Sequence, residues 1–220
     1  MVEHSTPFRL PTVKATTLLQ SSLVATRRGV LILAAGASQR MGAPKALLAW
    51  GNSTLVEYVL EQARTAAADV IVVVLGPATR HLDGTLGDVR VALNLEPESG
   101  RSASIRIGTA ALQSDVESIV IQSVDQPCGA EVLNALFVAA ALGADIVVPT
   151  HNGRRGHPIC MAGRLLPELR TVTEESEGLR AVVRAHAQHL VEVAVDSESV
   201  LWNLNDPAAY AAARSSVVQP

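Results

Sequence analysis

Apolar runs of strand length alternate with longer amphipathic stretches along most of the chain, from residue 29 onward. In the longer stretches the apolar residues recur at intervals of three and four, as they do on one-sided helices. The runs predict strands at 30–35, 70–75, 89–94, 119–124, 146–149 and 190–195, and the stretches predict helices at 55–67, 104–112, 131–142 and 179–186. This alternation is typical of an α/β domain with a mainly parallel sheet and helices on both faces.

The first 28 residues do not follow that pattern. Their apolar pieces are too short for a signal core or a membrane span, and the segment ends on Arg27 and Arg28. We expect residues 1–28 to form a mobile tail rather than a structured arm. Residues 29–220 are expected to form one domain, because a chain of 220 residues with 48% hydrophobic content can bury one sizeable core.

Composition narrows the classes of function. A formal net charge of -3 offers no basic field, and aromatic residues make up only 3% of the chain, too few for a platform on which bases stack. The two cysteines, Cys128 and Cys160, cannot form a disulfide framework and lack the spacing of a zinc site. We expect no nucleic-acid partner, no membrane partner and a location in the reducing cytoplasm.

The loop after the first predicted strand carries candidate phosphate ligands. It reads LAAGASQRMGAPK, from Leu33 to Lys45, and lies where open parallel sheets bind ligands. Its small residues let backbone amides approach an anion, while Arg40 can grip two phosphate oxygens and Lys45 can place a point charge on a leaving pyrophosphate. A tight turn with two solvated cations is the simpler alternative. We favour phosphate binding because both cations and Gly42 share this first crossover.

Two familiar phosphate motifs are excluded in this loop. Ser38 and Met41 stand where a dinucleotide-binding fingerprint needs glycine, and no Gly-Lys-Ser/Thr follows for a P-loop. The loop therefore indicates neither a dehydrogenase nor a P-loop protein.

A carboxylate follows the fourth predicted strand, in the segment Asp125-Gln126-Pro127. The carboxyl ends of parallel strands meet at one sheet edge, so Asp125 is expected near the loop after the first strand. Mg²⁺ commonly takes only one or two protein carboxylates when it also binds phosphates, which makes Asp125 the first choice as its ligand. Capping of the following helix is the alternative role.

The run from Leu33 to Lys45 resembles the signature LAAGxSxRMGxxK of the MobA-like nucleotidyltransferases, most closely that of the molybdenum cofactor cytidylyltransferases. The similarity continues in pieces from Val30 to about Tyr210. It implies a Rossmann-like fold that transfers a nucleoside monophosphate from a triphosphate to a phosphate monoester, with Mg²⁺ and release of pyrophosphate. The residues expected to act in catalysis are Arg40, Lys45 and Asp125.

The same resemblance implies two binding regions. The segment from Asn94 to Ser104 is similar to the family's N-P-x-x-x-G-x-x-x-S element, which contacts the base. The segment GRRGHP after the fifth strand is similar to the G-x-R-G-H-P element on the acceptor side, where His157 has a positioning role. The nucleotide-binding residues are then Leu33, Ala34, Ala35, Gly36, Ser38, Asn94 and Ser104, and the acceptor-binding residues are Arg155, Gly156, His157 and Pro158.

The C-terminal segment departs from the cytidylyl branch. Asn203 and Asn205 replace both aspartates of its D-x-D-T-P element, whereas the guanylyl branch has a similar N-x-N-T-P element. Asn205 can still coordinate Mg²⁺ through its amide oxygen, beside Asp125. The motifs thus divide between CTP and GTP, although the reaction type is the same.

Our hypothesis is an enzyme that moves CMP from CTP to the phosphate of a molybdenum (molybdopterin) cofactor, with a molybdoenzyme as receiver of the product. One alternative is the same fold acting with GTP or on another phosphate acceptor, such as a sugar phosphate. Another is a catalytically weak carrier that binds nucleotide and cofactor.

Overall fold

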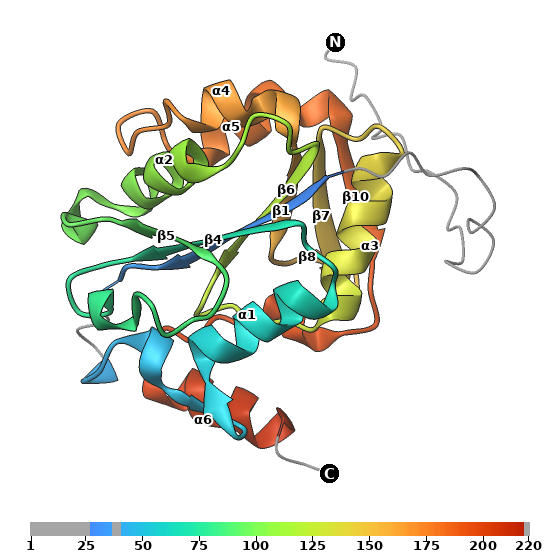
Figure 1. Cartoon of the computed structure of the whole chain (residues 1–220). Coiled ribbons are helices and arrows are strands. Elements are labelled where there is room, and N and C mark those ends of the chain that lie inside the picture. The colour runs from blue at the N-terminus through green and yellow to red at the C-terminus, as the bar shows by residue number, and fades with distance from the viewer. Residues whose placement is uncertain (1–26, 37–40, 218–220) are drawn as a thin grey trace.

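A mainly parallel sheet forms the centre of the protein in the computed structural model, which describes residues 27–36 and 41–217 (Figure 1). The order across the sheet is β10 (Leu190–Ala194), β7 (Ile146–His151), β9 (Ile159–Ala162), β6 (Ser118–Ser123), β1 (Arg28–Ala34), β4 (Val70–Leu75) and β5 (Arg90–Leu93). β1 pairs in parallel with β4 on one side and with β6 on the other. The predicted fold class is confirmed.

Two strands of the sheet were not predicted. β9 lies antiparallel between β6 and β7, and β8 (Arg154–Arg155) forms a short hairpin with β7. All four residues of β9 are buried. The run ICMA therefore lacks the alternation of a half-buried strand, and it is too short to distinguish from a turn by pattern.

Helices cover both faces of the sheet, as Figure 1 shows. Successive side chains of a strand point to opposite faces. Val30 and Ile32 accordingly pack into the core that α1 (Leu55–Thr65) and α3 (Ala130–Ala141) share, and Leu31 and Leu33 pack into the opposite core. The helices on that second face are α2 (Arg101–Ala111), α4 (Leu166–Leu169) and α5 (Leu179–Ala185).

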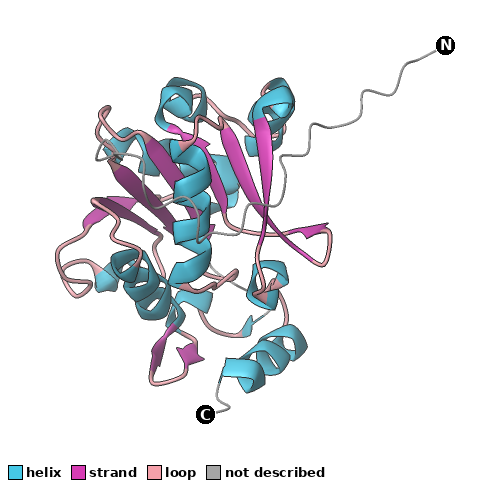
Figure 2. Ribbon diagram, turned by 90° about the vertical axis from the view of Figure 1, so that its right-hand side faces the viewer, coloured by secondary structure: helices cyan, strands magenta, loops and turns pink. Residues whose placement is uncertain are grey.

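A third, smaller cluster attaches the C-terminal helix, α6 (Pro207–Val217), to the domain. Trp50, at the end of β2 (Ala49–Trp50), is 1% exposed, and the rings of Tyr58, Trp202 and Tyr210 lie 5.9 to 6.2 Å from it. β2 pairs with β3 (Ser53–Thr54). In Figures 1 and 2, α6 lies at the lower end of the molecule, below the sheet.

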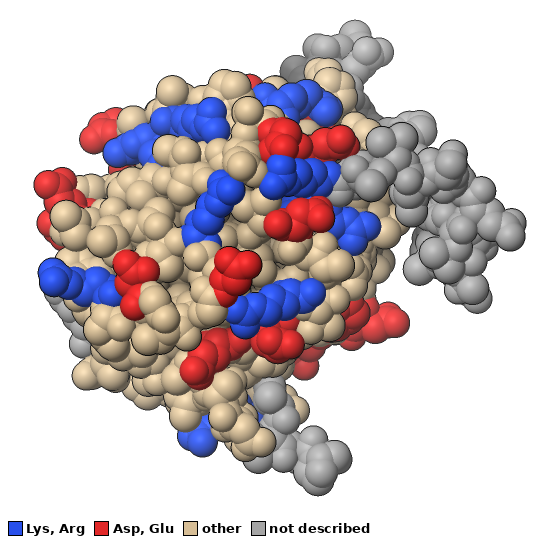
Figure 3. All heavy atoms as spheres, viewed as in Figure 1, with Lys and Arg blue, Asp and Glu red and all other residues tan. Residues whose placement is uncertain are grey.

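Short 3-10 helices complete the described elements: η3 (Lys45–Leu47), η4 (Arg80–Leu82), η5 (Pro97–Ser99), η6 (Gly163–Leu165), η7 (Ala187–His189) and η8 (Glu198–Leu201). Among the described helices, none has both the length and the hydropathy that a membrane span needs. On the face drawn in Figure 3, acidic and basic side chains are interspersed, so no field of one sign covers that side.

The start of the domain differs from the expected boundary. Arg28 is the first residue of β1, and Arg27 forms an ion pair with Asp115 and a hydrogen bond with Gln113. Both arginines therefore belong to the folded domain and not to the tail. Residues 1–26 lie outside the described part of the chain, so the tail itself stays a prediction.

Helix α2 packs closely on the sheet at Gly108. A Cβ atom at this position would come 2.2 Å from Leu31 Cδ1 and 2.8 Å from Val74 Cγ2, far inside van der Waals contact. Both neighbours are fully buried side chains of β1 and β4. The absence of a side chain at Gly108 thus sets how near the helix lies to the strands.

Gly108→Ala is expected to lower the free energy of unfolding by about 1 to 3 kcal/mol, because the methyl group must displace packed side chains, and this outweighs alanine's better helix propensity. Urea denaturation measures the change. Ala110→Leu adds a larger group on the exposed side of the same helix and should stay within about 0.5 kcal/mol of wild type. Equal stability of Gly108→Ala and wild type would contradict the close packing.

Candidate active site

Three side chains from distant parts of the sequence meet at the carboxyl edge of the sheet. The Nζ atom of Lys45 lies 2.7 Å from Asp125 Oδ2 and 2.6 Å from Asn205 Oδ1. The side chains of Lys45 and Asp125 are only 13% and 18% exposed. The structure therefore brings together three residues that the sequence assigned to catalysis or metal binding.

The sheet register explains this convergence. Ser123 pairs with Leu33 between β6 and β1, and the next residue, Val124, donates its N–H to the Leu33 carbonyl at 3.2 Å. Asp125 thus follows directly beside the end of β1. From the other side, the buried Leu204 donates its N–H to the Asp125 carbonyl at 2.9 Å, which places Asn205 next to the carboxylate.

The charges around Asp125 keep it ionised. Burial opposes ionisation, but hydrogen bonds from Lys45 and Ser123 and the positive charges of Lys45 and Arg101 outweigh it. The pKa of Asp125 therefore lies below its ordinary value. A carboxylate that stays charged in a partly buried place is suited to holding a cation.

Arg101, which the sequence reasoning did not single out, is part of this site. It is the first residue of α2 and is exposed at the surface. The protein atoms around its guanidinium nevertheless lower its pKa, while the charges of Asp125 and Glu174 oppose that shift. Arginine stays charged in proteins regardless. The sequence reasoning missed Arg101 because it predicted that the helix begins at residue 104, whereas α2 begins at residue 101. A helix predicted from residue 101 would have placed this arginine at its N-terminus.

A distant carboxylate caps that helix. The N-cap residue of α2, Gly100, has no side chain, and the Glu174 carboxylate accepts the N–H of Ser102 at 2.7 Å. A negative charge at a helix N-terminus satisfies free amides and interacts well with the helix dipole. Glu174 therefore fixes the turn from which Arg101 extends.

The residues expected to border the base lie together. Asn94 is 1% exposed and Ser104 is 6% exposed, and Asn94 Nδ2 donates to Ser104 Oγ at 2.9 Å. Asn94 Oδ1 accepts the N–H of Glu96 at 3.0 Å. This pair is a rigid polar group behind the sheet edge, and its contact with a base stays a prediction.

The loop after β1 is described in part. Leu33, Ala34 and Ala35 are buried and Gly36 is exposed, and the Ala34 carbonyl accepts a hydrogen bond from Thr79 Oγ1 at 3.1 Å. Ser38 and Arg40 lie outside the described residues, so their predicted contacts with nucleotide are untested. The start of the loop, at Leu33, lies beside the turn that carries Asp125.

On the acceptor side, Gly156 allows a close approach of backbones. A Cβ atom there would come 2.3 Å from the Val200 carbonyl oxygen, which accepts the N–H of His157 at 2.7 Å. Burial and the charge of Arg101 lower the pKa of His157, while Asp125 partly opposes them. His157 thus belongs to the same electrostatic neighbourhood as Asp125, and these surroundings favour its neutral imidazole. This neutrality is consistent with a positioning role.

The other predicted acceptor residues are placed differently. Pro158 is buried immediately before β9 and follows a cis peptide bond. Arg155 has a side chain that is 61% exposed and donates from Nε to Glu192 on β10 at 2.8 Å. No described hydrogen bond or ion pair connects Arg155 with Lys45 or Asp125. An acceptor that binds Arg155 would have to compete with Glu192.

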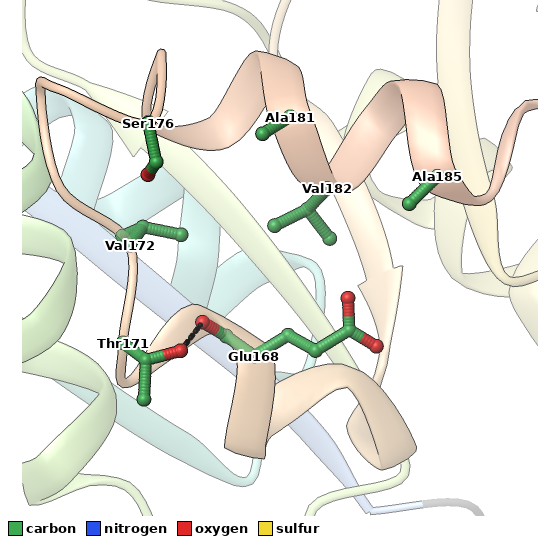
Figure 4. Close-up of a pocket in the computed structure, with 8 residues that line it drawn as sticks. Glu168, Thr171, Val172, Ser176, Ala181, Val182 and Ala185 are labelled. Atoms are coloured by element: carbon green, nitrogen blue, oxygen red, sulfur yellow. Dashed lines mark hydrogen bonds between the residues drawn. The ribbon is translucent and has the colours of Figure 1, made fainter.

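A hollow of about 240 Å³ lies elsewhere, between α4 and α5. Figure 4 shows Val182 and Ala181 of α5 facing Glu168 and Thr171 across it. The Glu168 carboxylate, its one charged group, is hydrogen-bonded to His186 Nε2 at 2.9 Å. The hollow thus lacks the converging cations and oxygen ligands of the Lys45 site.

Comparisons with known proteins bear on the family of this domain. The family model for the MobA-like NTP transferase domain matches residues 30–191. Nicotine blue oxidoreductase of Paenarthrobacter nicotinovorans is 30% identical over 165 residues, which are 70% of this chain and 80% of that protein. A probable molybdenum cofactor guanylyltransferase of Bacillus mycoides is 27% identical over 126 residues. The match covers 57% of this chain and 62% of that protein, which is less than two thirds of its length.

A solved structure extends the similarity to the whole fold. The crystal structure of Rv0371c from Mycobacterium tuberculosis superposes with a TM-score of 0.76 and is 26% identical. The similarity covers 87% of this chain and 98% of that one. The fold described above is therefore shared with a known structure over nearly its full length.

Glu174→Ala is expected to destabilise the protein at pH 7 by about 1 kcal/mol, through loss of a helix cap. Hydrogen bonds from Ser102 lower the pKa of the Glu174 carboxyl below its ordinary value. The stabilisation is therefore present above the unfolded pKa and lost as the pH falls through the folded pKa. Urea unfolding at neutral pH and at about pH 3 measures whether the difference from wild type disappears in acid.

Glu98→Ala, which removes an exposed carboxylate of η5, is the control and should change stability little at either pH. Wild-type stability of Glu174→Ala at pH 7 would show that the cap contributes nothing.

Proposed function

Because the chain belongs to the MobA-like NTP transferase family, we propose that it transfers a nucleoside monophosphate from a nucleoside triphosphate to a phosphate-bearing acceptor. The observation that carries the proposal is the meeting of the Lys45 ammonium with oxygens of Asp125 and Asn205 at the sheet edge. A triphosphate and its metal ion need such a combination of a cation and hard oxygen ligands.

In the proposed reaction, an oxygen of the acceptor phosphate bonds to the α-phosphorus, and the bond from that phosphorus to pyrophosphate breaks. Lys45 offsets the negative charge that develops on the pyrophosphate, and Arg101 adds a second positive charge near Asp125. Arg40 has the same assigned role as Lys45. Catalysis then rests on positioning and charge, without a covalent intermediate on the enzyme.

The oxygens of Asp125 and Asn205 would hold Mg²⁺, whose preferred ligands are carboxylate and carbonyl oxygens. The described residues contain no group of three or more His, Cys, Asp or Glu side chains suited to a metal, so phosphates and water would complete the shell. Once bound, Mg²⁺ would neutralise charge on the phosphates. The single carboxylate is thus compatible with a metal that arrives with its nucleotide.

CTP is the donor that we favour, with the phosphate of a molybdopterin cofactor as acceptor. Support comes from the segments Ala34-Ala35-Gly36 and Arg155-Gly156-His157-Pro158, which are similar to those of the cytidylyl branch. The rigid pair of Asn94 and Ser104 offers hydrogen-bonding groups to a base, where one lost bond changes discrimination by about 1 to 3 kcal/mol.

GTP is the second candidate donor, and a specific observation favours it. Asn203 and Asn205 are similar to the N-x-N element of the guanylyl branch, and the Bacillus relative is named a probable molybdenum cofactor guanylyltransferase. The other relative is named nicotine blue oxidoreductase, so the names of relatives do not by themselves fix the reaction, which must be argued from the site.

Pyrophosphate release tests the proposal directly. The protein, Mg²⁺ and molybdenum cofactor are incubated with CTP, GTP, ATP or UTP, and a sugar phosphate replaces the cofactor in a parallel series. Release with CTP and cofactor supports the favoured reaction, and release with GTP assigns the guanylyl reaction. Nucleotide binding without pyrophosphate release from any combination of nucleotide and acceptor would instead indicate a carrier protein.

Asp125→Asn is expected to lower kcat by about a hundredfold or more, because the neutral amide no longer supplies the negative charge that holds the metal and orients Lys45. Asp83→Asn, an exposed carboxylate in the segment after η4, removes the same charge elsewhere and should keep the wild-type rate. Circular dichroism checks that both variants fold. A rate near wild type in Asp125→Asn would refute the role of this carboxylate.

A further inference from the structure

The Lys45 ammonium lies at the point where the two oxygen ligands converge. Its Nζ atom is 2.7 Å from Asp125 Oδ2 and 2.6 Å from Asn205 Oδ1, so both oxygens already bind a cation. A metal ion that used both oxygens at its normal bond length would lie about 4 Å or less from this ammonium. The two cations therefore compete for the same two oxygens.

The balance of charge favours the ammonium in the protein without nucleotide. Lys45 and Arg101 both act on the single carboxylate of Asp125, and the amide of Asn205 brings no charge. Because the Lys45 and Asp125 side chains are mostly buried, solvent screens these interactions less than at an open surface. Glu174 offsets part of the Arg101 charge, but both ligand oxygens already face the Lys45 ammonium, and a divalent ion would have to enter against that charge.

A triphosphate reverses this balance, since it brings several negative charges and strong oxygen acceptors. The lysine side chain carries its ammonium on a flexible four-carbon stem and can transfer it from one set of oxygens to another. When Lys45 turns to phosphate oxygens, the oxygens of Asp125 and Asn205 become available together. Metal and nucleotide are then bound at the same stage.

We propose that Lys45 acts as a placeholder that excludes divalent metal ions from the free protein, so that the metal ion enters only with a triphosphate. This inference rests on the proposed function for the identity of the ligand that moves Lys45. The part of the proposal that concerns the metal ion applies to the nucleotide-free protein alone and can be tested without catalytic turnover. Lys45 thus determines that the metal ion binds only together with the triphosphate, in addition to offsetting the charge that develops on pyrophosphate.

The test measures Mn²⁺ binding to the nucleotide-free protein by electron paramagnetic resonance of the free ion. Lys45→Met removes the competing charge and should bind Mn²⁺ at least about tenfold more tightly than wild type. Lys45→Arg keeps a cation and should resemble wild type. Arg80→Met removes one exposed positive charge elsewhere and controls for the change in net charge.

A double variant, Lys45→Met with Asp125→Asn, locates the binding. If the double variant no longer shows the tighter Mn²⁺ binding of Lys45→Met, the proposal is supported. If the tighter binding persists, the proposal is overturned, because the ion then binds elsewhere. Unchanged affinity in Lys45→Met, or an equal gain in Arg80→Met, also overturns it. If circular dichroism shows that Lys45→Met does not fold, Lys45→Gln replaces it in the same comparison.

The outcome is independent of the proposed reaction. Absence of pyrophosphate release with every nucleotide would refute the transferase activity and leave the Mn²⁺ comparison intact, because no nucleotide is present in it. Conversely, an active enzyme whose free form binds Mn²⁺ as tightly as Lys45→Met would refute the placeholder and keep the transferase.

Discussion

Parallel pairing of β1 with β4 and β6 is the constraint on which the site depends. It brings the carboxyl ends of three strands to one edge and fixes them by register, with Leu33 opposite Ser123 and Val74. The turn that carries Asp125 is then held by a hydrogen bond from Val124 to Leu33. The Asp125 carboxylate and the Lys45 ammonium, 80 residues apart in the chain, become neighbours as a consequence of backbone pairing.

Two further supports come from outside the sheet. The segment before α6 is bound to the Asp125 carbonyl through Leu204, and the turn before α2 is held by the Glu174 carboxylate. Each support fixes one side chain of the site, Asn205 in the first case and Arg101 in the second. The charge of Asp125 is thus surrounded by groups that three different parts of the fold position.

Much of this architecture could be predicted from the sequence. The buried strands are continuous apolar runs, and their alternation with amphipathic helices predicted a mainly parallel sheet with helices on both faces. The position of Asp125 after a strand also predicted that it would lie near Lys45, because strand ends share an edge. β9 could not be predicted, since a four-residue buried strand has no periodicity, and α6 is too rich in alanine for its buried side to stand out.

The roles of Arg101 and Glu174 depend on tertiary contacts that no local pattern contains. A carboxylate 72 positions away caps α2, and neither residue stands in a recognisable motif for that interaction. The same holds for the bond between Arg155 and Glu192, which joins a hairpin to an edge strand. Propensity and spacing describe neighbours along the chain, whereas these pairs are neighbours only after the sheet has formed.

The aromatic cluster beneath the sheet gives the protein an internal optical reporter. Its two tryptophans, Trp50 and Trp202, lie with their rings 5.9 Å apart in an edge-on arrangement. Trp202 precedes Asn205 by three residues in the segment that is hydrogen-bonded to Asp125. All tryptophan emission of this chain therefore arises from one cluster next to the site, and a shift of that segment would change the wavelength or intensity of the emission without any added label.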